Sequence, residues 1–334
     1  MFETNINFNH KTILITGGAG FVGSSLVFYF QDKFPDANLI VFDCFRNEKI
    51  FSNGNLQSFG HYKNLIDFKG EVISGNINNF KDLKILDNYE FDYIFHQAAI
   101  SDTRVPNQEL ILKTNINSFF EILKLSKKNN ASLVYASSAA TYGNLPSPQK
   151  VGVESPDNPY GFSKFAMDQI ALNAMKQDST LNIVGLRYFN VYGPREFYKA
   201  KTSSMILQLG HQIISGCAPK LFNDSDKIFR DFIYIDDVIQ ANIKACTAKK
   251  NGIYNVGTGT SRSFQNVADV LQKNLKTDLG THYIPNPYEG YQTNTQADIK
   301  QAQKYLNFHP NFSLEDGIAK YIPEIKNSYG KTDQ

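Results

Sequence analysis

The sequence of 334 residues has few of the side chains that bind metals or form cross-links. Its three cysteines, Cys44, Cys217 and Cys246, are far apart and odd in number, so they give neither a zinc-ligand spacing nor a disulfide framework. The six histidines are equally scattered, with no metal-binding pair at helical spacing. We therefore expect a protein that has no metal site and depends on no disulfide bonds.

Long apolar runs and a strong charge of one sign are also missing. No segment approaches the roughly 18 apolar residues of a membrane span, and the stretch from Met1 to Lys11 lacks the apolar core of a signal peptide. The net charge is only +2, which creates no strong field for nucleic acid or membrane lipid. We expect a cytoplasmic protein without nucleic-acid or membrane partners.

Short apolar runs alternate with helical stretches over the first half of the chain. Strands are expected at 12–15, 38–42, 72–74, 93–95, 132–136 and 183–187, and helices at 21–34, 110–129 and 160–175. This alternation predicts βαβ units and a parallel sheet. After Tyr188 the pattern loosens, and only a helix at 235–248 and a strand at 253–256 are clear.

These elements predict an α/β fold with a Rossmann-type, doubly wound parallel sheet and a smaller, interleaved C-terminal α/β lobe. The dinucleotide-binding domain is expected to comprise residues 1–188 and 235–258. The substrate-binding lobe is expected to comprise residues 189–234 and 259–334. Residues 47–64 are polar and irregular, and they predict a long surface loop.

Three glycines follow the first expected strand in a GxxGxxG pattern: Gly17, Gly20 and Gly23. Glycine lets the backbone approach a pyrophosphate, which the N–H groups of the next helix then bind. The triplet alone is a weak signal, but a strand precedes it, a helix follows it, and Asp43 ends the second strand. Asp43 is expected to hydrogen-bond the adenosine ribose, and Arg46 is either a 2′-phosphate contact or an ordinary surface arginine.

Tyr160 and Lys164 form a YxxxK pair at the start of an expected helix. Because residues i and i+4 share one helix face, Lys164 is expected to lower the pKa of the Tyr160 phenol. The phenol could then exchange a proton with a sugar hydroxyl, and Ser138, at the end of a strand, could hydrogen-bond the same oxygen. A second match, Tyr29 with Lys33, is interpreted as part of the first helix, without chemistry.

These motifs resemble the extended short-chain dehydrogenase/reductase family. The matching segments are TGGAGFVG at 16–23, HQAA at 96–99, YASSAATYG at 135–143, YGFSK at 160–164 and RYFNVYGPR at 187–195. The resemblance implies an NAD(P)-dependent enzyme acting on a nucleotide-linked sugar.

Within the family, the chain resembles the isomerase branch that epimerises an ADP-linked heptose at C6 for the inner core of lipopolysaccharide. The closer signatures are RYFNVYGPRE at 187–196, KLF at 220–222, RDFIYI at 230–235 and TQAD at 295–298. The resemblance implies an ADP-heptose as the small-molecule substrate. We also expect a homo-oligomer.

The resemblance further implies roles for individual residues. The two acid/base residues are matched by Tyr160 and Lys199, assisted by Lys164 and Ser138. Cofactor positions are matched by Gly17, Gly20, Phe21, Val22, Gly23, Asp43, Cys44, Arg46, Gln97, Ala98, Ala99, Ile100, Ser101, Asn115, Lys164, Val191 and Lys199. Substrate positions are matched by Ser101, Asn190, Ser204, His211, Phe222, Asn223, Asp224, Ser225, Arg230 and Tyr291.

The chain departs from the family after the second catalytic lysine. The stretch that begins at Lys199 is two residues longer than the family's glycine–serine step, so Lys201 rivals Lys199, and Ser203 rivals Ser204. Two bases are expected because hydride leaves and returns on one side, so the sugar ketone must turn over and present its oxygen to another wall. The alternative is one base plus water.

The chain also departs from the family pattern near the expected cofactor contacts, because its loop at 47–64 is longer than is usual in the family. It leaves His61 and Lys81 as alternative contacts for the cofactor phosphates. Asp43 alone favours NAD, whereas Arg46 and the resemblance favour NADP. We expect NADP, with NAD tolerated.

Other functions compete with this hypothesis. A 4,6-dehydratase needs acidic residues after the catalytic serine, but Ser138 is followed by Ala139-Ala140-Thr141, which cannot supply elimination chemistry. A UDP-hexose 4-epimerase stays open as the alternative enzyme. A non-catalytic nucleotide-binding scaffold is disfavoured because Tyr160, Lys164 and Ser138 are all present.

Overall fold

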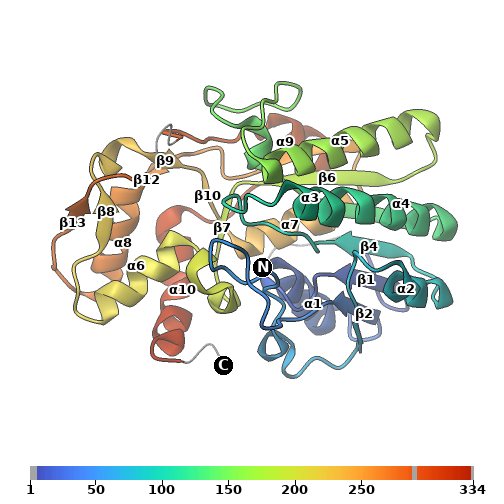
Figure 1. The fold of residues 1–334 in the computed structure, drawn as a ribbon, viewed down its shortest axis with the longest axis horizontal. Helices are drawn as coiled ribbons and strands as arrows, with labels where there is room; N and C mark the ends of the chain where they lie inside the picture. Colours follow the sequence, from blue (N-terminus) through green and yellow to red (C-terminus); the bar gives the residue numbers. More distant parts are fainter. Residues whose placement is uncertain (1–5, 288–291, 332–334) are drawn as a thin grey trace.

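The computed structural model describes residues 6–287 and 292–331. Its centre is a parallel seven-stranded sheet in the order β11–β6–β5–β4–β1–β2–β3 (Figure 1). The strands are β1 (Thr12–Thr16), β2 (Asn38–Asp43), β3 (Glu71–Ser74), β4 (Tyr93–His96), β5 (Ser132–Ser138), β6 (Ile183–Tyr188) and β11 (Gly252–Val256). The strand order reverses between β1 and β4, which is where open α/β sheets bind ligands. The predicted Rossmann-type fold is confirmed.

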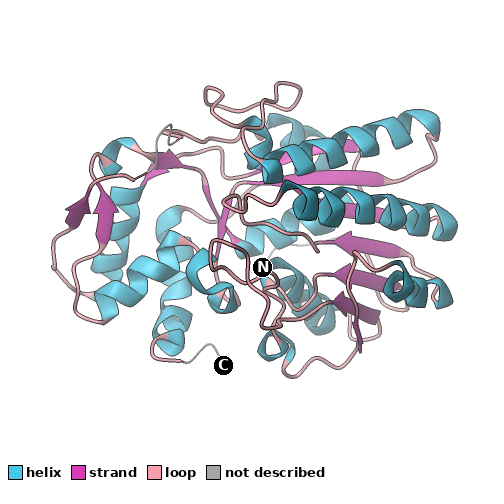
Figure 2. Cartoon of the chain, in the orientation of Figure 1, coloured by secondary structure: helices cyan, strands magenta, loops and turns pink. Residues whose placement is uncertain are grey.

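Both faces of the sheet are buried, which explains the nearly continuous apolar runs of its strands. Along β1, Ile13 and Ile15 belong to one core and Leu14 to the other. Helices cover both faces (Figure 2): on one face α1 (Phe21–Lys33) and α7 (Ile235–Ala245), and on the other α4 (Ser118–Asn129) and α5 (Pro159–Gln177). The sheet is therefore doubly wound, and the helix expected at 235–248 ends three residues early.

The helix expected over 110–129 is interrupted. Helix α3 (Gln108–Leu112) passes into a π-helical turn (Lys113–Asn117) before α4 begins. Within the turn, Asn115 is fully buried, and its amide hydrogen-bonds both the N–H and the carbonyl of Ile100 at 2.9 and 3.0 Å. The wider turn thus fixes the loop that follows β4, and π-bulges are frequent at functional sites.

The second lobe contains three helices that pack on one another: α6 (Met205–Ile214), α8 (Phe264–Leu275) and α10 (Leu314–Ser328). Two-stranded pairs surround them, formed by β7 (Asn190–Tyr192) with β10 (Phe232–Tyr234), β8 (Lys220–Phe222) with β13 (His282–Ile284), and β9 (Phe229–Arg230) with β12 (Arg262–Ser263). Among the described residues there are also two shorter helices, α2 (Phe80–Leu83) and α9 (Lys300–Leu306). Because β11 returns to the central sheet beside β6, the two lobes are interleaved in sequence; the exact division at 188, 234 and 258 stays a proposal.

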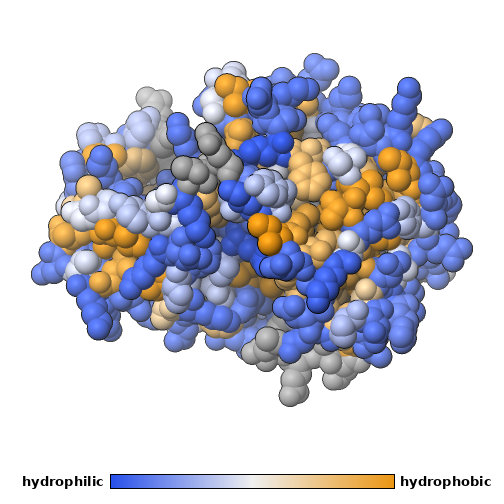
Figure 3. All heavy atoms as spheres, turned by 90° about the horizontal axis from the view of Figure 1, so that it is seen from below, coloured by the Kyte–Doolittle hydropathy of each residue, from blue (hydrophilic) through white to orange (hydrophobic). Residues whose placement is uncertain are grey.

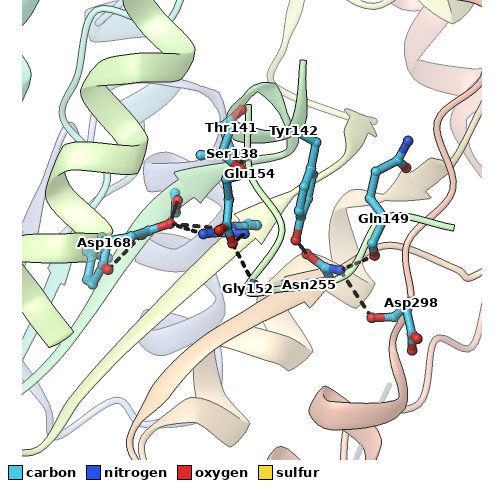
Figure 4. Close-up of polar contacts among 12 residues, drawn as sticks. Ser138, Thr141, Tyr142, Gln149, Gly152, Glu154, Asp168, Asn255 and Asp298 are labelled. Atoms are coloured by element: carbon cyan, nitrogen blue, oxygen red, sulfur yellow. Dashed lines mark hydrogen bonds and ion pairs between the residues drawn. The ribbon is translucent and has the colours of Figure 1, made fainter. Parts of the chain in front are cut away.

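A buried ionic network joins β5, β6 and α5. The carboxylate of Asp168 accepts hydrogen bonds from Tyr135, Ser137 and Arg187 at 2.8, 2.9 and 2.9 Å. The guanidinium of Arg187 also pairs with Glu154 at 2.6 Å, and Figure 4 labels both carboxylates, Asp168 and Glu154. The network attaches the loop after β5 to the core beneath the C-terminal ends of the strands.

The same loop is tied to a distant part of the chain. Tyr142 donates to the side-chain oxygen of Asn255 at 2.5 Å, and the Asn255 amide donates to the carbonyls of Gln149 and Asp298 at 2.9 and 3.1 Å (Figure 4). Asn255, on β11, therefore links the loop after β5 to the segment before α9.

Figure 3 shows one face of the molecule, on which polar and apolar side chains are mixed. On the face seen from below, apolar side chains reach the surface in patches between polar ones (Figure 3). Among the helices of residues 6–287 and 292–331, none combines the length and the apolar character that crossing a membrane requires.

Candidate active site

A cavity of about 660 Å³ opens where the C-terminal ends of the sheet strands face the second lobe. Its walls come from the turn after β1, from the ends of β2, β4, β5 and β6, and from the stretch before α6. It brings together most of the predicted site residues, namely Gly17, Gly20, Phe21, Val22, Gly23, Asp43, Cys44, Gln97, Ala98, Ala99, Ile100, Ser101, Ser138, Tyr160, Lys164, Asn190, Val191, Lys199, Ser204 and Arg230.

The glycine turn forms a hollow that side chains would fill. Gly17 has a φ of 70°, and a Cβ there would lie 2.7 Å from the Ala98 nitrogen. A Cβ on Gly23 would lie 2.1 Å from the carbonyl oxygen of Gly17. Helix α1 follows Gly20, which has no side chain to cap the first N–H groups, so these groups can bind an anion. The residues present therefore fit the pyrophosphate of a dinucleotide.

Asp43 turns toward this cradle. Its carboxylate accepts hydrogen bonds from the backbone N–H groups of Ala19 and Phe45, each at 2.9 Å. Burial raises the pKa of the Asp43 carboxyl, while these bonds oppose the rise. The residue thus stabilises the glycine turn directly, and its contact with a ribose stays a prediction.

Tyr160 lies at the start of α5, beside the end of β5. A hydrogen bond with Ser138 lowers the pKa of the phenol, but burial is the larger effect and raises it. The ammonium of Lys164 donates to the Ala136 carbonyl at 2.7 Å and lies 6.0 Å from the centre of the Tyr160 ring. Burial therefore penalises the phenolate and Lys164 is bonded to Ala136, so the lowering of the phenol's pKa by Lys164 stays a prediction.

Lys164 itself is in an unfavourable place for a charge. Burial lowers its pKa to about 8, and the carboxylate of Asp168, one helical turn further along α5, opposes that effect. On the same helix, Ser163 accepts a hydrogen bond from Asn115 at 2.8 Å, so the π-helical turn is tied to α5 between Tyr160 and Lys164.

A second candidate base reaches the cavity from the segment Phe197–Thr202, which consists of two short 3₁₀ turns that meet at a kink at Ala200 and is called the 3₁₀ helix below. The ammonium of Lys199 lies 5.6 Å from the centre of the Phe21 ring, and Lys199 lines the cavity whereas Lys201 is not among its lining residues. Burial lowers the pKa of Lys199, and the nearby carboxylate of Glu196 opposes that effect. The position of the two side chains relative to the cavity therefore distinguishes Lys199 from Lys201, the two candidates for the second base.

The two rival serines both line the cavity, but they differ in their partners. The Ser204 hydroxyl caps α6 by accepting from the N–H of Leu207 at 3.2 Å, and it donates to Glu196 at 2.8 Å. Ser203 is buried beside it. Ser204 therefore holds the backbone as well as facing the cavity.

Several predicted cofactor and substrate residues lie outside the cavity wall. Asn115 is buried behind it, and Arg46 donates to the carbonyl of Tyr198. His211 lies on α6, half-buried, with its Nε2 atom 3.0 Å from the Ser328 hydroxyl on α10. Tyr291 lies outside the described residues.

The predicted segment 222–225 belongs to a different hollow. Asn223 and Asp224 line a second pocket of about 480 Å³, together with Lys227 and Thr293. Phe222 ends β8 just before it, and Ser225 is buried just after it. Of the predicted substrate residues, Ser101, Asn190, Ser204 and Arg230 therefore line the main cavity, and Asn223 and Asp224 line this second hollow.

Three residues of this region were missed by sequence reasoning. Lys49 lines the cavity, although it belongs to the loop expected to be a surface loop. Tyr188 lines it too, and its hydroxyl contacts Gln97 and Asn242, each at 3.1 Å. Glu196 is fully buried and accepts hydrogen bonds from Gly193 and Ser204. The sequence could have indicated Glu196 through its position three residues before Lys199, because residues with that spacing share one side of a 3₁₀ helix.

Two candidate proton-transfer groups beside a hollow that fits a dinucleotide are typical of one class of protein: an enzyme that uses an NAD-type cofactor to act on a hydroxyl group. The chain belongs to the NAD dependent epimerase/dehydratase family, whose model matches residues 13–257.

Individual relatives extend the match to nearly the whole chain. The ADP-L-glycero-D-manno-heptose-6-epimerase of Brachyspira hyodysenteriae is 35% identical over 326 residues, covering 95% of this chain and 99% of the relative. The crystal structure of the enzyme of the same name from Helicobacter pylori is 48% identical, with a TM-score of 0.89, covering 98% of this chain and 99% of that one. A UDP-glucose 4-epimerase from Thermotoga maritima, solved with UDP-glucose, is 26% identical with a TM-score of 0.83, covering 95% of this chain and 99% of that one.

Proposed function

We propose that the chain converts ADP-D-glycero-D-manno-heptose to ADP-L-glycero-D-manno-heptose by inverting C6, a step that serves the inner core of lipopolysaccharide. The observation that carries this proposal is that Lys199 lines the same cavity as Tyr160, which supplies two acid/base groups to one sugar. The names of the relatives at 35% and 48% identity support the same substrate.

The chain's part in the reaction is to move a proton at each side of the sugar. The bound cofactor supplies a reversible hydride acceptor at C6. Tyr160 takes the proton of the C6 hydroxyl as the carbonyl forms, with Ser138 hydrogen-bonded to the same phenol. After the ketone has turned over, Lys199 donates a proton to its oxygen. The proton gained by Tyr160 and the one lost by Lys199 exchange with solvent between turnovers, so the reaction balances.

The cofactor is inferred to be NADP, with NAD tolerated. Because Arg46 donates to the Tyr198 carbonyl, Lys49 is the better candidate for a 2′-phosphate: it lines the cavity with Cys44 and Ser58, next to Asp43. The measurement is the nucleotide released on denaturation, followed by the affinity of each variant. Lys49→Ala should weaken NADP and leave NAD unaffected. Release of NAD alone, with unchanged NADP affinity in Lys49→Ala and Arg46→Ala, would reject the inference.

Arg230 is the proposed contact for the substrate diphosphate, because a planar guanidinium suits phosphate oxygens. Its Nη atoms donate to the carbonyls of Phe229 and Gln292 at 2.8 and 2.7 Å, and it lies over the Phe264 ring. The guanidinium is therefore held in place at the cavity wall before substrate arrives. Asn223 and Asp224, in the second hollow, are proposed for the nucleoside end.

The decisive experiment is to incubate the protein with ADP-D-glycero-D-manno-heptose and follow inversion at C6 by NMR. UDP-glucose is tested in parallel, because it is the substrate expected for the alternative function, a UDP-hexose 4-epimerase. Inversion of the heptose alone supports the proposal, inversion at C4 of the hexose alone replaces it, and turnover of neither substrate favours a binding scaffold.

We further propose a homo-oligomer in the cytoplasm. Phe120 on α4 and Phe162 on α5 are each 47% exposed, on helices that run side by side (Figure 1). Light scattering measures the assembly, and Phe120→Glu with Phe162→Glu should shift it toward the monomer if these rings lie in the interface.

A further inference from the structure

Two segments lie against each other: the long loop at 47–64 with its preceding residue Arg46, and the stretch from Arg195 to Tyr198 that leads into Lys199. In the first, His61 stacks on Tyr198 of the second, with ring centres 3.9 Å apart and planes 8° from parallel. Arg46 donates to the carbonyl of the same Tyr198. Asn64 and Arg195 exchange hydrogen bonds, each donating to the other's carbonyl, at 3.3 and 2.8 Å. These contacts join residues more than a hundred positions apart in the sequence.

The first of these segments is also attached to the cofactor cradle. The backbone of His61 and the side chain of Asn64 donate to the Ala19 carbonyl at 3.0 and 3.1 Å, within the glycine turn. Gly60 approaches Asp43 so closely that a Cβ would lie 2.2 Å from its carboxylate oxygen. His61 is only 4% exposed. Residues 46–64 therefore form a bridge, referred to below as the bridging loop, in which His61 contacts both the cradle and Tyr198.

The contact of the bridging loop with Tyr198 lies next to the second candidate base. Tyr198 immediately precedes Lys199 in the 3₁₀ helix. The ends of that helix are held by Glu196, whose carboxylate accepts from the N–H groups of Gly193 and Ser204. Its middle is held from outside through Tyr198. Because the Tyr198 carbonyl that Arg46 contacts belongs to the peptide bond with Lys199, a shift of Tyr198 would move the Lys199 backbone.

We propose that Tyr198 is a positioning residue for Lys199, and that the bridging loop couples the position of Lys199 to the cofactor cradle. This inference rests on the proposed function, in which Lys199 donates the second proton. Proton transfer requires close alignment, and a displacement of about 1 Å can reduce a rate about a hundredfold. A base on a short 3₁₀ helix needs such outside support, since its own backbone hydrogen bonds are few.

The first test measures the backbone without using activity. Amide hydrogen exchange at residues 197–204 should slow in the wild type when NADP is added, because NADP orders the cradle that holds the bridging loop. Tyr198→Ala and His61→Ala should speed exchange there and abolish the response to NADP. Tyr198→Phe keeps the stacked ring and should behave as the wild type. Tyr62→Ala is the matched control, since Tyr62 also stacks on His61, at 5.0 Å, but is 61% exposed.

The second test measures which proton donor is lost. The 6-keto form of the ADP-heptose is reduced with NADPH, and the two C6 epimers are quantified. In Tyr198→Ala the epimer that depends on Lys199 should fall about ten- to a hundredfold, while the other epimer stays within about twofold. Tyr198→Phe and Tyr62→Ala should keep the wild-type ratio.

The possible outcomes distinguish a failure of the positioning role of Tyr198 from a failure of the proposed function. If Lys199→Met loses one epimer but Tyr198→Ala keeps both, Tyr198 does not position the base and the proposed function stands. If both epimers fall equally in Tyr198→Ala and His61→Ala while exchange rises across the whole molecule, Tyr198 only stabilises the fold. If Lys199→Met itself keeps both epimers, the two-base function fails, and the positioning role fails with it.

Discussion

At the scale of single residues, the pKa of Lys164 is lower than that of an exposed lysine. Its pKa is about 8 because the ammonium is buried. The protonated form makes the 2.7 Å bond to Ala136, so activity should fall as the pH rises through about 8. Lys164→Arg, which stays protonated to above about pH 12, should lose this fall while retaining a lower rate. The measurement is kcat against pH; the same fall at the same pH in Lys164→Arg would assign it to another group.

The choice between the two neighbouring lysines is also a question for single residues. Lys199 lines the cavity, and Lys201 is not among its lining residues. Lys199→Met should therefore lose one of the two C6 epimers when the 6-keto substrate is reduced, by about a hundredfold or more. Lys201→Met is the matched control and should lose neither. Equal, mild losses in both variants would favour one base plus water.

At the scale of elements, the 3₁₀ helix that carries Lys199 contains a strained residue. Ala200 has a φ of 49° and a ψ of −127°, a conformation that glycine adopts readily and alanine rarely. Such strain costs about 1–3 kcal/mol. Against this, glycine increases the conformational entropy of the unfolded chain, which lowers the stability of the folded protein by about 0.4–1 kcal/mol. Ala200→Gly should therefore raise the free energy of unfolding by about 1 kcal/mol, measured in urea, and Ala200→Val should lower it. A loss of stability in Ala200→Gly would show that the conformation is not strained.

The elements also show what sequence patterns can and cannot predict. The glycine turn and the Tyr160–Lys164 helix were predicted because each depends on neighbours within a few residues. The π-helical turn was not, because its cause is a distant contact between Asn115 and Ile100. The loop at 47–64 was expected on the surface, yet Phe51 is among its buried residues.

Over the whole molecule, the same limit applies to the candidate site. Arg46 was predicted to face the cofactor from its spacing after Asp43, and only the folded chain shows that it reaches Tyr198 instead. His211 and the segment 222–225 came from resemblance alone, and no pattern in the sequence fixes which hollow they face. Long-range packing decides these positions, and it leaves no periodic trace in the sequence.

The buried ionic network gives a prediction about the stability of the whole molecule. Arg187→Met would leave Asp168 and Glu154 buried without their cation, and such losses cost about 3–5 kcal/mol. Glu154→Gln keeps the pair of Arg187 with Asp168 and should cost less. Urea unfolding of the two variants measures the difference. An Arg187→Met protein within about 1 kcal/mol of the wild type would mean that the network contributes little.

The place of β11 in the sheet has a consequence for how the chain is made. Strand β6 needs β11 as its neighbour, but β11 is synthesised about 60 residues later, after much of the second lobe. At about 5–20 residues per second, the edge of β6 stays open on the ribosome for roughly 3–12 seconds. Nascent chains stalled before Gly252 should therefore be cleaved by protease more readily than chains in which Val256 has left the exit tunnel. During that interval, this apolar strand edge can pair with another nascent chain, so this stage of synthesis is when the protein is most in need of a chaperone.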